Sequence, residues 1–181
     1  MKAHANFGLA LLTRRIVALS IVFVAVAAVA VGSACAASVT IVALGASNTY
    51  GKGVAHGQAY PAQLEAMLRA KGIDAHVVNA GINGDTTGGM LSRAGSVPAG
   101  TRVVILQPGG NDARKGQGGD EAGNVSAISS RLAARGIKVV VLQNSMLQGL
   151  PHQPDGQHLT PEGYRMLAAS LLPEVESAIR H

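Results

Sequence analysis

The segment VTIVALGASNT, residues 39–49, joins an apolar run to a short polar turn. Its first six residues are rich in valine and isoleucine, which is the composition of a buried β-strand. Gly45 then permits a tight turn, so Ser47 is expected at the point where the strand ends. A Gly-x-Ser turn is by itself usually only a turn. Ser47 therefore becomes a candidate nucleophile only if the chain supplies partners for it elsewhere.

Three further apolar runs have a similar length and character. Each is followed by glycine, asparagine or proline, as is typical of a strand that ends in a turn. They cover residues 75–80, 102–106 and 138–143. Together with residues 39–44 they predict the buried strands of a parallel sheet.

Helical patterns lie between and after these runs. The predicted helices cover residues 61–71, 87–94, 122–135 and 161–179. Leu64, Met67 and Leu68 give the first of them an apolar stripe that can pack on the sheet. Thr160 is expected to cap the last helix and Pro173 to kink it. This alternation predicts an α/β fold of three layers, α/β/α, with a central parallel sheet of four or five strands.

Asp155 and His158 stand three residues apart in Asp-Gly-Gln-His, just ahead of the last predicted helix. This spacing lets one turn of backbone hold a carboxylate against an imidazole, as the general base of a serine nucleophile requires. With Ser47 upstream, the chain has the order Ser, Asp, His. The rival bases are His56 in a surface-type loop, His76 at the start of a predicted strand, and His152 close to His158.

The loops that follow the four predicted strands contain the unusual residues of this chain. Ser47 follows the first strand, Gly-Asp-Thr at 84–86 follows the second, and Gly-Gly-Asn-Asp at 109–112 follows the third. The segment ending in Asp155 and His158 follows the fourth. Acyl transfer through serine needs a nucleophile, a base, an orienting acid, and donors aimed at the developing oxyanion. The four loops supply candidates for each.

This set of motifs, in this order, resembles the SGNH hydrolases, also called the GDSL family, and is nearest to their small bacterial thioesterase, arylesterase and lysophospholipase branch. The resemblance covers residues 39–179 and implies the flavodoxin-like SGNH hydrolase fold and a reaction without a cofactor. By motif it implies that Ser47, Asp155 and His158 are the catalytic triad. It also implies an oxyanion hole made by the backbone N–H groups of Ser47 and Gly84 and the side-chain amide of Asn111.

Two features depart from the pattern of this family. The family usually has an aspartate after the first glycine, where this chain has Ala46. A local hydrogen-bond partner for the nucleophile turn is therefore expected to be missing. The stretch between Asn111 and Asp155 is also short, as if one helix and one edge strand were absent, and predicts a more open substrate groove.

Two other kinds of site are less consistent with the sequence. His152, Asp155 and His158 could form part of a zinc site, but no fourth ligand with comparable spacing is present, so we expect no metal. The glycine-rich segment 84–89 lacks the lysine that a phosphate-binding loop would place there.

Residues 1–37 have the three-part pattern of an export signal. Basic residues precede an apolar stretch at 16–31, and small residues follow it, with Ala34-Cys35-Ala36 as a small-x-small cleavage site. We therefore expect a leader at 1–37 and one SGNH hydrolase domain at 38–181, in the periplasm or secreted. An uncleaved leader or a lipidated Cys35 is the alternative, and would be the only attachment to a membrane.

Removing the leader changes the charge of the chain. Three of its 15 basic residues lie in the leader, which leaves 12 basic against 10 acidic residues. No basic cluster longer than Arg114-Lys115 remains, so we expect no nucleic-acid partner. The only cysteine is Cys35, so the domain at 38–181 can form no disulfide.

The sequence thus predicts an exported serine hydrolase that cleaves ester or thioester bonds in small acyl or lipid-derived substrates. Tyr50, Tyr60 and Tyr164 are the only aromatic residues after the leader, too few for an extended platform on which a polysaccharide could stack. A carbohydrate O-acetylesterase or acetyltransferase of the cell envelope is the alternative enzyme. A non-catalytic periplasmic binding protein on the same scaffold is the alternative of a different class.

Overall fold

The computed structural model describes residues 38–181. The expected export signal at residues 1–37, including Cys35, lies outside the described residues. Within 38–181, no helix is both long enough and apolar enough to cross a membrane.

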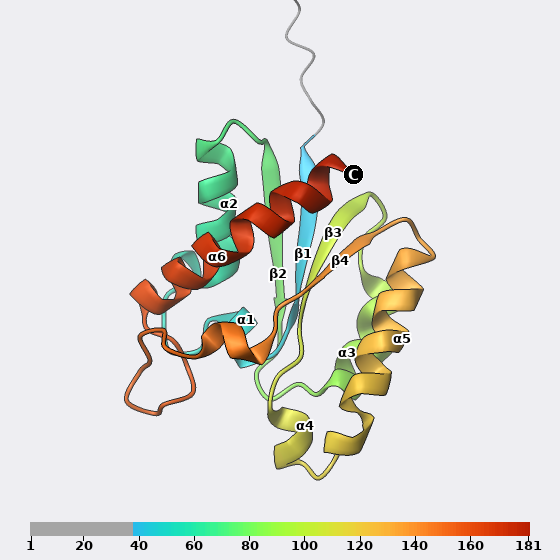
Figure 1. The fold of residues 1–181 in the computed structure, drawn as a ribbon, viewed down its shortest axis with the longest axis vertical. Coiled ribbons are helices and arrows are strands. Elements are labelled where there is room, and N and C mark those ends of the chain that lie inside the picture. Colours follow the sequence, from blue (N-terminus) through green and yellow to red (C-terminus); the bar gives the residue numbers. More distant parts are fainter. Residues whose placement is uncertain (1–37) are drawn as a thin grey trace, which may run out of the picture. The chain divides into compact units, whose positions relative to one another are not determined.

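Residues 38–181 fold around a central sheet of four parallel strands (Figure 1). In spatial order the strands are β2 (Ala75–Gly81), β1 (Val39–Gly45), β3 (Thr101–Gln107) and β4 (Lys138–Val141). All four predicted strands are confirmed, and the sheet has the smaller of the two predicted strand numbers. β4 ends two residues earlier than the sequence predicted.

The strand order places a change of direction between β1 and β3. Ile41 in β1 pairs with Val77 of β2 on one side and with Val103 of β3 on the other. The chain moves from β1 outward to β2, and then returns across β1 to form β3. In open parallel sheets such a point creates a crevice at the carboxyl ends of the two strands. Ser47 follows β1 and Asn111 follows β3, so both border this crevice.

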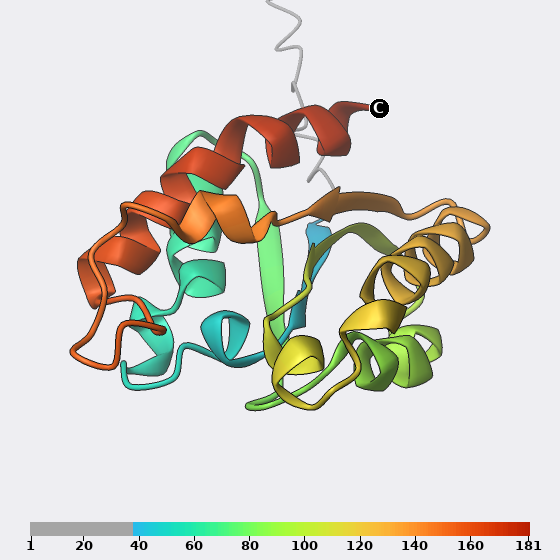
Figure 2. The ribbon, with the colours of Figure 1, turned by 60° about the horizontal axis from the view of Figure 1, so that its bottom comes forward.

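Helices α2 (Tyr60–Ala70) and α6 (Pro161–Arg180) cover one face of the sheet (Figures 1 and 2). Leu64 and Leu68 of α2 and Leu167 of α6 are fully buried in the core on this face. Thr160 caps α6 as predicted, because its Oγ1 accepts a hydrogen bond from the N–H of Gly163 at 3.1 Å. The helix continues through Pro173, so this residue does not end it.

Helices α3 (Thr87–Arg93) and α5 (Glu121–Ala133) cover the opposite face. Met90 of α3 and Ile128 and Leu132 of α5 are fully buried against the other side of β1 and β3. The strands alternate between the two cores: Ile41 faces the first and Val42 the second. The predicted three-layer α/β/α architecture is therefore confirmed.

Three short helical turns follow the carboxyl ends of the strands, and the sequence did not predict them. They are α1 (Ser47–Tyr50) after β1, α4 (Asn111–Arg114) after β3, and a 3₁₀ turn (Asn144–Leu147) after β4. Each is only four residues long, too short to have a helical period. These turns contain Ser47, Asn111 and Asn144, which line the pockets at this edge of the sheet.

Candidate active site

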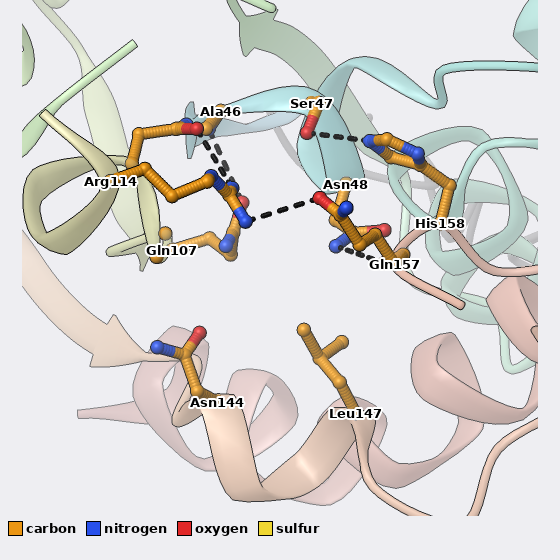
Figure 3. Close-up of a pocket in the computed structure, with 12 residues that line it drawn as sticks. Ala46, Ser47, Asn48, Gln107, Arg114, Asn144, Leu147, Gln157 and His158 are labelled. Atoms are coloured by element: carbon orange, nitrogen blue, oxygen red, sulfur yellow. Dashed lines mark hydrogen bonds between the residues drawn. The ribbon is translucent and has the colours of Figure 1, made fainter. Parts of the chain in front are cut away.

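Ser47, His158 and Asp155 form a continuous chain of hydrogen bonds, of which Figure 3 shows the one between Ser47 and His158. His158 Nδ1 lies 2.6 Å from Asp155 Oδ2, and His158 Nε2 lies 2.9 Å from Ser47 Oγ. Because a carboxylate only accepts hydrogen bonds, the proton of the neutral imidazole is on Nδ1. Nε2 is then free to accept the hydrogen of the serine hydroxyl. The arrangement is that of a nucleophile and its general base.

Asp155 is held in place by the backbone of its own turn. Its Oδ1 accepts hydrogen bonds from the N–H groups of Gln157 at 2.9 Å and His158 at 3.0 Å. The hydrogen bond with the His158 side chain, followed by these two backbone donors, lowers the pKa of Asp155 well below its ordinary value. The carboxyl group therefore stays ionised and keeps the imidazole oriented.

The loop that carries His158 is anchored on both sides. Gln153 donates its backbone N–H to the carbonyl of His158 at 2.7 Å, and His152 forms an antiparallel bridge with the buried Leu159. Asn48, next to the nucleophile, links this loop to α6: its Nδ2 donates to the carbonyl of Gln157, and its Oδ1 accepts from the Tyr164 hydroxyl. The base is thus fixed relative to the nucleophile turn.

The three rival histidines are engaged elsewhere. The Nδ1 atom of His152 lies 2.7 Å from the carbonyl oxygen of Leu150. His76 pairs with Glu65 on the surface, and His56 packs edge-on against Tyr50. Within residues 38–181, no group of three histidine, cysteine, aspartate or glutamate side chains is arranged to hold a metal ion.

The nucleophile turn has a hydrogen-bond partner that the sequence did not reveal. Gln107, the last residue of β3, accepts hydrogen bonds through Oε1 from the N–H of Ala46 at 3.2 Å and from Thr49 Oγ1 at 3.1 Å. Gln107 and Ala46 are both buried. Ala46 has no polar side chain to act as the local partner, as expected from the sequence, but Gln107 of the neighbouring strand supplies a distant one. A polar residue at the end of the apolar run of β3 was the signal.

Asn111 begins α4 with its amide fixed at both ends. Its Nδ2 donates to the carbonyl of Asp85 at 2.8 Å, and its Oδ1 accepts from Arg114 Nη2 at 2.8 Å. A carbonyl can only accept and a guanidinium can only donate, so the two contacts define which end of the amide is which. The second hydrogen on Nδ2 remains available for a substrate.

Gly84 brings the loop after β2 to the same place. It has a φ of 75°, a conformation that favours glycine, and its carbonyl accepts a hydrogen bond from Lys115 Nζ at 2.8 Å. Gly84, Asn111 and Ser47 line one pocket of about 210 Å³. The structure therefore brings together all five residues that the sequence singled out.

Arg93 and Asp112 hold the loop that contains Gly84 in place. Arg93 of α3 forms an ion pair with Asp85 and donates to the carbonyls of Ala80 and Gly45, the ends of β2 and β1. The buried Asp112 accepts hydrogen bonds from the N–H and hydroxyl of Thr87. These contacts set the distance between the Gly84 loop and Asn111, and sequence reasoning missed them because their partners lie far apart in the chain.

Ser47 opens onto two adjoining pockets. The pocket of about 210 Å³ contains Gly84, and another of about 200 Å³ extends toward Asn144 and Leu147 (Figure 3). Arg114 and Gln157 line both pockets, and Arg114 Nη1 donates to Gln157 Oε1 at 3.1 Å. Among residues 38–181, no aspartate or glutamate lines either pocket.

The chain is similar to known esterases in sequence. Esterase TesA of Pseudomonas aeruginosa is 33% identical to it over 110 residues, which is 59% of this chain and 55% of that esterase. The chain thus spans about half the length of this curated relative.

Two solved structures share the fold of this chain. The crystal structure of TesA superposes with a TM-score of 0.68 at 24% identity, over 77% of this chain and 99% of the other. The esterase EstA from Pseudoalteromonas sp., inhibited by monoethylphosphonate, gives 0.68 at 16% identity, over 78% and 99%. These two show the shared fold.

The crystal structure of AlinE4, an SGNH-hydrolase family esterase, is similar in sequence as well. It gives a TM-score of 0.54 at 30% identity, over 79% of this chain and 73% of the other. The GDSL-like lipase/acylhydrolase family matches residues 43–169, a range that includes Ser47, Gly84, Asn111, Asp155 and His158. The chain therefore belongs to the GDSL-like lipase/acylhydrolase family, within the SGNH hydrolases.

Proposed function

We propose that this protein is an exported serine esterase or thioesterase that hydrolyses small acyl esters. The observation that carries the proposal is the hydrogen-bonded chain from Asp155 through His158 to Ser47, which lies beside Gly84 and Asn111. The same constellation contains a nucleophile, a base, an orienting acid and oxyanion donors.

In the first half of the reaction, Ser47 Oγ attacks the acyl carbonyl while its proton passes to His158 Nε2. Asp155 accepts a hydrogen bond from Nδ1–H throughout and stabilises the imidazolium. His158 then gives its proton to the leaving alcohol or thiol as the carbonyl re-forms, which leaves an acyl group on Ser47. In the second half, water attacks this acyl group with the same proton transfers, and the acid is released.

The negative charge that develops on the carbonyl oxygen is stabilised by three donors. They are the backbone N–H groups of Ser47 and Gly84 and the free N–H of the Asn111 amide. Because Asp85 and Arg114 already fix that amide, it does not reorganise as the charge develops.

The size of the site favours small acyl groups. The two adjoining pockets beside Ser47 are each about 200 Å³, which gives room for a small acyl group in one and a leaving group in the other. The relatives TesA, EstA and AlinE4 are esterases, which fits an ester substrate.

Export rests on the sequence of residues 1–37. Expression of the full chain in a bacterium with two membranes, followed by fractionation and N-terminal sequencing, tests it. A periplasmic product that begins near residue 37 supports cleavage, and a cytoplasmic product with an intact N-terminus contradicts export.

Purified protein of residues 38–181 should hydrolyse chromogenic esters, with acetyl to hexanoyl chains preferred over long chains. A parallel thioester series separates esterase from thioesterase activity. Ser47→Ala is the matched control and should lose hydrolysis while keeping the wild-type melting temperature. Absence of hydrolysis across both series, in folded protein, contradicts the proposal.

A further inference from the structure

Arg114 places a positive charge in the candidate active site that no carboxylate neutralises. Its guanidinium donates to Asn111 Oδ1 and Gln157 Oε1, and both of these acceptors are neutral amides. The ion pairs formed within residues 38–181 do not include Arg114. By contrast, Arg93 behind the site is paired with Asp85.

The surroundings of Arg114 add to this charge. Lys52 lines the pocket that contains Gly84, and it also belongs to none of those ion pairs. The acidic member of the triad, Asp155, is bonded to the Nδ1 side of His158, away from Ser47. The two pockets beside the nucleophile therefore carry positive charge without a lining carboxylate.

We infer that the site selects esters that carry a carboxylate or phosphate group, and that Arg114 binds this group. The inference rests on the proposed esterase function. A guanidinium has five N–H groups, of which two are used here, and its planar fork matches the oxygens of a carboxylate or phosphate. Because Arg114 lines both pockets, it can reach an anion on either the acyl part or the leaving group of a substrate.

Arg114 also positions Asn111, and the two roles have different kinetic signatures. Loss of the contact with Asn111 Oδ1 would lower kcat for charged and neutral esters alike. Loss of an anion-binding group would lower kcat/KM for charged esters only. The ratio of kcat/KM for a charged ester to that for its neutral counterpart therefore reports the anion-binding role alone.

Two matched pairs of esters test the inference. The first pair is 4-nitrophenyl hydrogen adipate and 4-nitrophenyl hexanoate, which differ by a carboxylate at the end of the acyl chain. The second is 4-acetoxybenzoate and its methyl ester, which differ by a carboxylate on the leaving group. Comparing each variant with wild type cancels the difference in intrinsic reactivity within a pair. The pair whose charged-to-neutral ratio changes when Arg114 is substituted shows whether the anion lies on the acyl part or on the leaving group.

We expect Arg114→Gln to lower the charged-to-neutral ratio of kcat/KM about tenfold in at least one pair. This is the lower end of the effect expected for losing a hydrogen bond to a charged group, because the site is exposed to solvent. Arg114→Lys should lower it less, since the charge remains and the fork is lost. The wild-type ratio should also fall as salt is raised. Lys138→Gln, at the start of β4, removes the same charge away from the pockets and should leave the ratio unchanged.

A wild-type ratio that survives Arg114→Gln in both pairs overturns the inference. If neutral esters are hydrolysed at the same time, the esterase function still stands. If no ester in either pair is hydrolysed and Ser47 does not react with a fluorophosphonate, the proposed function fails, and this inference fails with it.

Discussion

Asn111 is the side chain whose role is most easily separated from binding. In the proposed mechanism its amide faces charge that exists only in the transition state, so Asn111→Ala should lower kcat about 10²- to 10³-fold with a much smaller change in KM. Asn111→Asp should lower kcat further, because a carboxylate accepts rather than donates. It would also face the carbonyl of Asp85 with a second acceptor.

Values of kcat and melting temperature, measured on the same preparations, check this prediction. A stable Asn111→Ala protein with unchanged kcat would remove the residue from the mechanism. Parallel losses of melting temperature and activity in both variants would instead indicate a purely structural residue.

Asp155 sets the tautomer of His158. In Asp155→Asn the amide can still accept from the backbone N–H groups of Gln157 and His158, so the turn is preserved. It no longer forces the proton onto Nδ1, however, and kcat should fall about 10³- to 10⁴-fold. Steady-state kinetics on the folded variant measure this, and a loss below tenfold would speak against the triad.

The lowered pKa of Asp155 also predicts how stability depends on pH. A carboxyl group whose pKa is lower in the folded state contributes stability above its unfolded pKa, about 3.9, and loses it as pH falls below that value. The difference in melting temperature between wild type and Asp155→Asn should therefore be present at neutral pH and shrink below about pH 4. A difference that stays constant across this range would contradict the assignment.

At the scale of elements, the end of β3 supports the turn after β1. Replacing Gln107 by methionine keeps its approximate volume but leaves the buried N–H of Ala46 without an acceptor. Thr49 keeps its contact with Tyr60. The cost of one unpaired buried donor is roughly 1–3 kcal/mol of unfolding free energy. Denaturant unfolding should show this loss for Gln107→Met and none for Gln117→Met, an exposed glutamine.

A Gln107→Met protein as stable as wild type would show that this hydrogen bond does not hold the turn. We also expect a lower kcat for the folded Gln107→Met protein, because the displaced turn contains Ser47.

The close approach of β2 to α1 depends on Gly81. A Cβ at this position would overlap the backbone nitrogen of Tyr50, which cannot move without moving the helical turn that begins at Ser47. Gly81→Ala should therefore destabilise the fold by roughly 1–3 kcal/mol and lower kcat.

The matched control, Gly123→Ala, should change the free energy of unfolding in the opposite direction. At Gly123 in α5 an added Cβ meets no atom within 4 Å, so Gly123→Ala should stabilise the fold by about 0.5–1 kcal/mol. Denaturant unfolding of the two variants gives both values. Equal effects would mean that the contact between β2 and α1 is looser than the structure indicates.

The strands and long helices could be predicted because each has its own pattern of apolar residues. Ile41 and Val42 face opposite cores, and Leu64 and Leu68 share one helical face. The short turns α1 and α4 could not be predicted, because a four-residue turn has no helical period and is fixed by contacts with residues elsewhere in the chain. Gln107 and Ala46 lie 61 residues apart in the sequence, so the polar residue at the end of β3 signals a hydrogen bond there without identifying its partner.

The sequence predicted the residues of the candidate site but not the residues that hold them in position. Ser47, Asp155 and His158 were identified by motif and order, and the structure places them in hydrogen-bond contact. Arg93 and Arg114 were not identified, because their importance depends on which carbonyls and amides surround them after folding. The local sequence around an arginine does not contain this information.

At the scale of the whole molecule, the sheet assembles the site from segments far apart in sequence. Ser47 follows β1, Asn111 follows the neighbouring strand β3, and His158 lies in the loop before α6, 111 residues after the serine. The parallel arrangement brings these loops to one edge, where each is tied to the next by hydrogen bonds such as those of Asn48. The central claim is that this edge contains one activated serine.

Reaction with a fluorophosphonate probe, followed by intact-protein mass and peptide mapping, tests that claim most directly. We predict one phosphonyl group per chain, attached to Ser47, and no labelling of Ser47→Ala that melts at the wild-type temperature. Labelling of Ser47→Ala, attachment to another residue, or no reaction of the folded wild-type protein would contradict the account.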